Sequence, residues 1–145
     1  MTVLLATSGD LPQGEPGAPV LDAVLAERGV DFAWARWDDP RVDWAAAELV
    51  AVRSTWDYVT RQTEFLAWAA SLDQARLLNG ADVFTWNHDK RYLADLDDLP
   101  VVPSVLADDR AGLAEAVAHF GTAVVKPRVS AGGAGLIVVS DPDDP

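Results

Sequence analysis

The segment LVAVRSTWDY (residues 49–58) begins with an apolar run, Leu49 to Arg53, and turns polar at Ser54. A short apolar run that breaks at polar residues is typical of a buried strand that ends in a loop. The N-terminal residues Thr2 to Thr7 (TVLLAT) repeat this pattern, because Ser8 to Asp10 (SGD) follow them. We therefore predict two buried strands, each with polar residues directly after its C-terminal end.

Helical segments and further strands are predicted around these two strands. A first helix carries apolar residues at helical spacing and ends at Gly29, where a left-handed cap is typical. Val30 to Trp37 (VDFAWARW) predicts another strand, and Leu77 with Leu78 predicts a short later one. Thr60 is a candidate N-cap for a helix with an apolar stripe. The apolar positions of the two helices are Val20, Leu21, Val24 and Leu25, and then Phe65, Leu66, Trp68, Ala69 and Leu72.

The alternation of strands and helices over residues 1–82 predicts the fold class of that region. Strands that alternate with helices of about 10 to 15 residues form a parallel sheet with crossover helices. We therefore expect an α/β fold with an open, mostly parallel, Rossmann-like sheet. Ligands of such sheets bind beyond the carboxyl ends of the strands, where Ser8 to Gly14 would share one edge with Arg53 to Tyr58.

The alternation of strands and helices ends after Asp82. Asn87 is a candidate N-cap for a helix over His88 to Leu96, and Pro100 to Pro103 (PVVP) predicts an extended segment. Asp108 or Asp109 is a candidate cap for a further helix that ends at Gly121. Residues 83–145 are therefore expected to form an α+β unit rather than to continue the parallel sheet.

Composition limits the classes of function. The chain has 145 residues, with 11 Lys and Arg against 23 Asp and Glu, and its formal net charge is −12. This balance argues against nucleic-acid binding, which needs a cationic face. Cysteine is absent, and no apolar stretch approaches the roughly 20 residues that span a bilayer. We expect a cytoplasmic protein with neither a nucleic-acid nor a membrane partner. Its aspartates follow no calcium-loop pattern, so we predict no metal ligand among them.

A lysine and a glycine-bearing loop form the first candidate site. Thr122 to Lys126 (TAVVK) predicts a strand, Arg128 to Gly135 a loop, and Leu136 to Val139 (LIVV) a strand that pairs back as an antiparallel hairpin. Glycines let successive backbone N–H groups turn toward one anion, and Lys126 would add a point charge of the kind that phosphates accept. The alternative is a simple hairpin turn beside a solvated lysine.

Lys90 forms the second candidate site. It lies in the first turn of the helix predicted after Asn87, where a cation is unfavourable unless an anion arrives. A bound nucleotide would supply that anion. The alternative is a surface lysine paired with nearby aspartates.

These motifs together resemble the start of an ATP-grasp central domain. They are Asn87-x-Asp89-Lys90, the PVVP segment, Val-Val-Lys126-Pro127 and the loop SAGGAG at residues 130–135. The preceding RSTWDY, residues 53–58, resembles the N-terminal domain of ligases related to the cycloserine-biosynthesis cyclo-ligase, and more distantly to glutathione synthetase and RimK-type ligases. The resemblance covers the whole chain, and its motifs agree in both order and spacing.

The resemblance implies a function and the residues that serve it. Such ligases use ATP and Mg²⁺ to phosphorylate a carboxylate, and an amine or similar nucleophile then attacks the acylphosphate. Lys90 and Lys126 would contact the nucleotide phosphates under a flexible loop of Ser130, Ala131, Gly132, Gly133, Ala134 and Gly135. A small carboxylate substrate would face Arg53, Ser54, Asp57 and Tyr58, of which Arg53 suits the carboxylate.

The resemblance also implies a domain division. We expect a pre-ATP-grasp domain over residues 1–82 and the first part of an ATP-grasp α+β subdomain over residues 83–145, cut short before the metal ligands and inactive alone. Leu136 to Val139 would then lack sheet partners on one side and favour self-association. The alternative function is a non-catalytic, acidic, flavodoxin-like α/β binding module.

Overall fold

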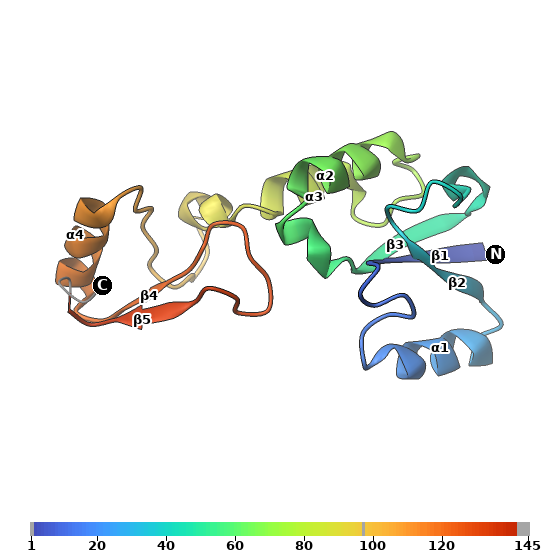
Figure 1. Ribbon diagram of the computed structural model, residues 1–145, viewed down its shortest axis with the longest axis horizontal. Coiled ribbons are helices and arrows are strands. Elements are labelled where there is room, and N and C mark those ends of the chain that lie inside the picture. The colour runs from blue at the N-terminus through green and yellow to red at the C-terminus, as the bar shows by residue number, and fades with distance from the viewer. Residues whose placement is uncertain (1, 97, 142–145) are drawn as a thin grey trace. The chain divides into compact units, whose positions relative to one another are not determined.

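The computed structural model describes residues 2–96 and 98–141. The chain divides into two compact units, Met1–Thr85 and Trp86–Pro145. Figure 1 shows their elements in chain order. The domain boundary predicted after Asp82 falls within helix α3 (Gly80–Asn87), just before this division. Each unit is described by itself below.

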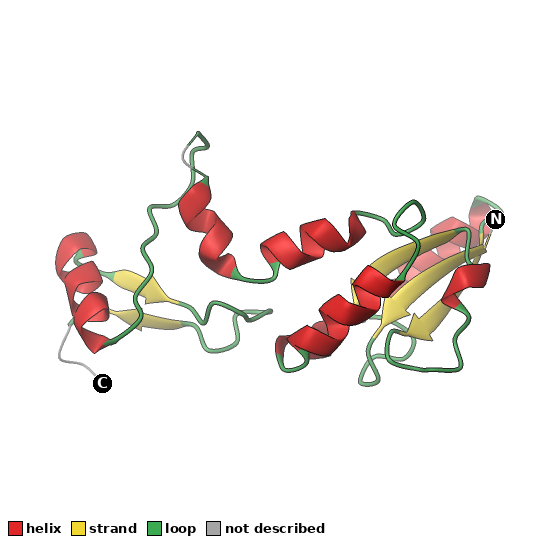
Figure 2. Cartoon of the chain, turned by 90° about the horizontal axis from the view of Figure 1, so that it is seen from above, coloured by secondary structure: helices red, strands yellow, loops and turns green. Residues whose placement is uncertain are grey.

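The first unit contains the predicted parallel sheet. Its strands are β1 (Thr2–Thr7), β2 (Asp31–Arg36) and β3 (Leu49–Ser54), in the order β2-β1-β3. Both pairings are parallel, and in Figure 2 the strand arrows of this sheet point the same way. The short strand predicted at Leu77 is reduced to a single parallel bridge with Val50.

Helices cover both faces of this sheet (Figure 1). On one face, α1 (Ala18–Glu27) contributes Leu21 and Leu25, which pack against the buried Val3 and Leu5 of β1. On the other face, α2 (Gln62–Ser71) buries Phe65 and Ala69 against residues of β1 and β3. Adjacent strand residues point to opposite faces, so one short apolar strand supplies both cores. The other two apolar residues of the α1 pattern, Val20 and Val24, lie on the exposed side of the helix.

Two predicted helix caps are wrong. Thr60 does not cap α2, because it ends the preceding 3₁₀ helix η2 (Trp56–Val59), and its hydroxyl donates to the carbonyl oxygen of Asp57. Asn87 does not begin a helix either, since it is the last residue of α3. Helix α3 was not predicted from the sequence, and it begins at a left-handed turn formed by Asn79 and Gly80.

The second unit combines a short helix, an α-helix and a hairpin. Asp89 caps the 3₁₀ helix η3 (Lys90–Asp95), which occupies part of the predicted His88–Leu96 helix. Asp109 caps α4 (Arg110–Phe120) by accepting from the N–H of Gly112 at 2.8 Å, and Gly121 follows with a φ of 75°. The predicted antiparallel hairpin is confirmed as β4 (Ala123–Val125) paired with β5 (Ile137–Val139).

The hairpin has one covered and one open face. Val139 is buried, as is Val117 of α4, whereas Val124 and Val138, which pair directly with each other, are 52% and 63% exposed. Leu136 and Ile137 are also exposed. Within the part of the chain that the structure describes, no helix is long and apolar enough to cross a membrane.

Candidate functional site

The glycine-bearing loop of the second unit has the backbone that its sequence predicts. Gly132, Gly133 and Gly135 adopt left-handed φ values of 61°, 76° and 71°. A Cβ atom at Gly135 would lie 2.7 Å from Cγ of Pro127, so only glycine fits there. A Cβ at Gly132 or Gly133 would meet no atom within 4 Å, which leaves open space beside this part of the loop. Two successive turns are closed by backbone hydrogen bonds. The N–H of Ala134 donates to Ala131 O, and the N–H of Leu136 donates to Gly133 O.

Lys90 is fastened to the first residues of the same loop. Its backbone N–H donates to Arg128 O at 2.9 Å, and its ammonium donates to both the carbonyl oxygen and the hydroxyl of Ser130 at 2.8 Å. Burial, and then the nearby charge of Lys126, lower the pKa of Lys90. The structure therefore brings together the two lysines and the loop that the sequence analysis singled out.

An ion pair between Asp89 and Arg128 also joins the residues next to Lys90 to the loop. Sequence reasoning did not single out Arg128 as a partner. The Nε–H of Arg128 donates to Asp89 Oδ1 at 3.1 Å, and Arg128 Nη2 contacts Oδ2 of the same carboxylate. Asp89 Oδ1 also accepts from the N–H of Arg91 at 2.9 Å. The Arg128 contact, followed by the Arg91 bond, lowers the pKa of Asp89 to about 2. The signal available in the sequence was an arginine just after the Lys126-Pro127 pair.

The predicted substrate residues lie at the carboxyl end of the sheet in the first unit. The pairing of β1 with β3 shifts between Ala6 and Thr7, which face Val52 and Ser54, so that Arg53 is the extra residue of a bulge. Arg53 Nη2 lies 2.7 Å from Oε1 of Glu15 in an ion pair. The buried Ser54 hydroxyl donates to the other oxygen of Glu15.

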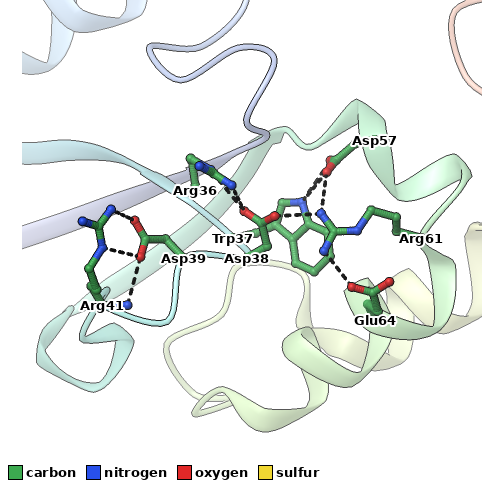
Figure 3. Close-up of polar contacts among 8 residues, drawn as sticks. All are labelled: Arg36, Trp37, Asp38, Asp39, Arg41, Asp57, Arg61 and Glu64. Atoms are coloured by element: carbon green, nitrogen blue, oxygen red, sulfur yellow. Dashed lines mark hydrogen bonds and ion pairs between the residues drawn. The ribbon is translucent and has the colours of Figure 1, made fainter.

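Asp57 belongs to a polar network around a tryptophan (Figure 3). Its carboxylate accepts from Nε1–H of Trp37 at 2.9 Å and lies 3.3 Å from Arg61 Nη1. Arg61 also pairs with Asp38 at 2.7 Å and with Glu64 at 2.6 Å, and its guanidinium lies 4.5 Å from the centre of the Trp37 ring. These contacts hold β2, η2 and α2 together. The contact of Asp57 with a substrate stays a prediction.

Tyr58 packs beside this network. Its ring centre lies 5.6 Å from that of Phe65, and burial raises the pKa of its phenol. A cavity of about 360 Å³ opens next to the network, lined by tryptophans and charged groups including Trp37, Trp44, Trp68, Asp38 and Arg61. Tyr58 does not line this cavity, and its role toward a substrate also stays a prediction.

The described residues include no group of three or more His, Asp or Glu side chains that could hold a metal ion. The described residues therefore form no metal site with three protein ligands by themselves. Lys90, the nearby charge of Lys126 and the left-handed glycines are groups of the kind that bind phosphates, and their contact with a nucleotide stays a prediction.

The fold defines a class: an α/β domain with a three-stranded parallel sheet, followed in the chain by an α+β unit in which Lys90 binds a glycine-bearing loop. Comparison with known proteins identifies the family. The family described as D-cycloserine synthetase DcsG, N-terminal domain, matches residues 3–79, more than half of the chain, and the chain belongs to this family. The relation to the cycloserine-biosynthesis ligases is thereby confirmed.

Two individual relatives extend this result. The chain is 34% identical over 120 residues to the cycloserine biosynthesis protein DcsG of Streptomyces lavendulae, a match that covers 81% of this chain and 40% of that protein. The crystal structure of D-cycloserine synthetase DcsG matches with a TM-score of 0.81 and 31% identity over 95% of this chain and 50% of that chain. The chain thus spans half or less of the length of these relatives.

Proposed function

We propose that this chain is the N-terminal part of an ATP-dependent ligase that joins a small carboxylate to an amine, or cyclises it, through an acylphosphate. The observation that carries this proposal is the attachment of Lys90 to Ser130 beside Lys126, within a family named for D-cycloserine synthetase. In this proposal, the second unit is the beginning of an ATP-grasp domain.

Contacts in the second unit support phosphate binding by these lysines and the loop. A lysine ammonium has three N–H donors. Two N–H donors of the Lys90 ammonium bind Ser130. The third makes a long contact of 3.5 Å with Arg128 O. A phosphate oxygen would replace this long contact of the third donor. Lys126 adds a second positive charge, and the left-handed glycines let the loop backbone approach the phosphates closely.

These groups would act by stabilising negative charge. ATP, when bound, supplies the phosphoryl group that activates the substrate carboxylate. Lys90 and Lys126 would neutralise charge on the phosphate oxygens as it shifts during transfer. Because Lys90 is held by the loop it serves, it would stay oriented without reorganisation. No residue is assigned to magnesium, because the described residues include no cluster of three or more candidate ligands.

A titration with ATP tests this proposal. We expect Lys126→Ala and Lys90→Ala each to weaken ATP binding at least about tenfold in calorimetry, because each removes a charge-assisted contact of about 1.5–3 kcal/mol. The matched control is Arg110→Ala, an exposed cation at the start of α4 that removes the same charge from the same unit. Equal ATP affinity in the parent chain and in all three variants would refute the proposal and favour a non-catalytic α/β binding module.

A further inference from the structure

The buried polar side chains of the first unit gather at one edge of its sheet. Among residues 2–96 and 98–141, the buried polar residues are Thr7, Ser8, Ser54 and Thr55, at the carboxyl ends of β1 and β3. β1 lies between β2 and β3, so the chain leaves it toward one side and returns on the other. In parallel α/β sheets, the crevice at such a switch point is where ligands bind.

Arg53 is presented at this edge by the backbone. The bulge after Val52 adds Arg53 to β3 without a partner residue on β1, and bulges of this kind re-aim side chains near binding sites. Its side chain is 44% exposed, and its contact with Glu15 uses Nη2. A guanidinium can bind a carboxylate through two nitrogens, so Arg53 retains capacity for a better-placed carboxylate.

Glu15 is bound here as an external carboxylate would be. One of its oxygens meets the Arg53 guanidinium and the other accepts from the Ser54 hydroxyl, while the backbone N–H of Glu15 donates back to Ser54 Oγ at 3.1 Å. The Ser54 bond is the largest cause that lowers the pKa of Glu15. Glu15 thus remains ionised and competes with any free carboxylate for the same two groups.

The loop that carries Glu15 follows a buried hydroxyl that has no partner among the described residues. Residues 9–17 fold back over the end of β1, where Thr7 Oγ1 donates to Leu11 O at 2.5 Å and the N–H of Gly14 donates to the same oxygen at 2.8 Å. Within the described residues, Ser8 Oγ is buried at this edge without a hydrogen-bond partner. A buried hydroxyl without a partner is costly. The closed loop is therefore not the fully satisfied state of this edge.

We propose that Arg53 and Ser54 form a binding site for the carboxylate of a small substrate, and that Glu15 occupies this site until the substrate carboxylate displaces it and opens the loop. This inference rests on the proposed function, because it assigns the carboxylate-binding groups of that ligase. It adds an internal competitor, Glu15, that would keep the site closed in the absence of substrate.

Acetate binding, followed by amide NMR shifts of the whole chain, tests this inference. If the loop is closed in about nine of ten molecules, removing the competitor should tighten acetate binding about tenfold. We therefore expect Glu15→Gln to bind acetate about tenfold more tightly than the parent chain. Glu27→Gln, at the exposed end of α1, is the control, since it removes the same charge from the same unit and should leave the affinity unchanged.

A second variant assigns the binding to Arg53. Adding Arg53→Gln to Glu15→Gln should weaken acetate binding at least tenfold, whereas chloride at equal ionic strength should not reproduce the acetate shifts in any variant. Equal acetate affinity in Glu15→Gln and Glu27→Gln, or persistence of binding without Arg53, would overturn the inference. If Glu15→Gln does not fold, acetate must still shift the Glu15 and Ser54 amide signals of the parent chain together, and a saturating titration without that shift would overturn it.

The two proposals fail separately. The acetate experiment contains no nucleotide and reports on residues of the first unit, whereas the ATP titration reports on Lys90 and Lys126 of the second. If Glu15→Gln does not change acetate affinity but the ATP titration gives the expected result, only the carboxylate-site inference is refuted.

Discussion

Gly14 is the position in the Glu15 loop where a single methyl group should have the largest effect. Its φ is +84°, and a Cβ atom there would lie 2.5 Å from Cη2 of Trp34 and 2.7 Å from Cβ of Ala18. The Trp34 ring cannot yield freely, because its Nε1–H donates to Asp22 at 3.0 Å and the ring packs on the core beneath α1. Gly14→Ala should therefore strain both the backbone and the packing.

The magnitude follows from comparison with Gly29. Gly29 also has a positive φ, +66°, but a Cβ atom there would meet nothing within 4 Å. Gly29→Ala should thus cost only the left-handed backbone strain, about 1–2 kcal/mol. Gly14→Ala adds overpacking to that strain, so we expect a total loss of about 2–5 kcal/mol in the free energy of unfolding.

Urea unfolding followed by circular dichroism and tryptophan fluorescence measures both variants. The expected result is a clearly lower midpoint for Gly14→Ala than for Gly29→Ala, with similar slopes. Faster hydrogen exchange at the Glu15 amide should accompany it, because the loop that places Glu15 is strained. Equal stability of the two variants would refute the reasoning, since it would mean that the space beside Trp34 is not filled as the structure has it.

Two further predictions concern the second unit. The pKa of Asp89, about 2 beside Arg128, lies below its ordinary value of 3.8, so its ionic contribution to stability is complete above about pH 4 and is lost as the pH falls toward 2. Asn can replace Asp89 as the cap of η3, so Asp89→Asn should lower the free energy of unfolding by at most about 1 kcal/mol at neutral pH. Urea unfolding should show the difference between the variant and the parent chain shrinking in acid. A difference independent of pH would contradict the charge argument. The open hairpin face should promote self-association, so light scattering should give a mass that rises with concentration, and the pair Val124→Thr and Val138→Thr should reduce that rise. A monomeric parent chain at high concentration would disprove this.

Local sequence was sufficient to predict strands and helix ends where these depend on residues close together in the chain. Apolar runs bounded by polar residues predicted β1 and β3, because a buried strand needs only a few consecutive apolar residues. Asp108 or Asp109 and then Gly121 predicted the two ends of α4, and Asp109 is the cap, since caps satisfy backbone groups within one turn. The cap predictions at Thr60 and Asn87 failed because both residues were already used by preceding helices of only four and eight residues.

The amino-acid sequence by itself determined the parallel sheet, the antiparallel hairpin, the family resemblance and the two lysines of the candidate nucleotide site. Only the tertiary structure decided which groups meet: Lys90 with Ser130, Asp89 with Arg128, and Glu15 with Arg53 and Ser54. These partners lie 38 to 40 residues apart in the chain. Periodicity and capping report on contacts within a few residues, whereas such pairs depend on how strands and loops close on one another in space.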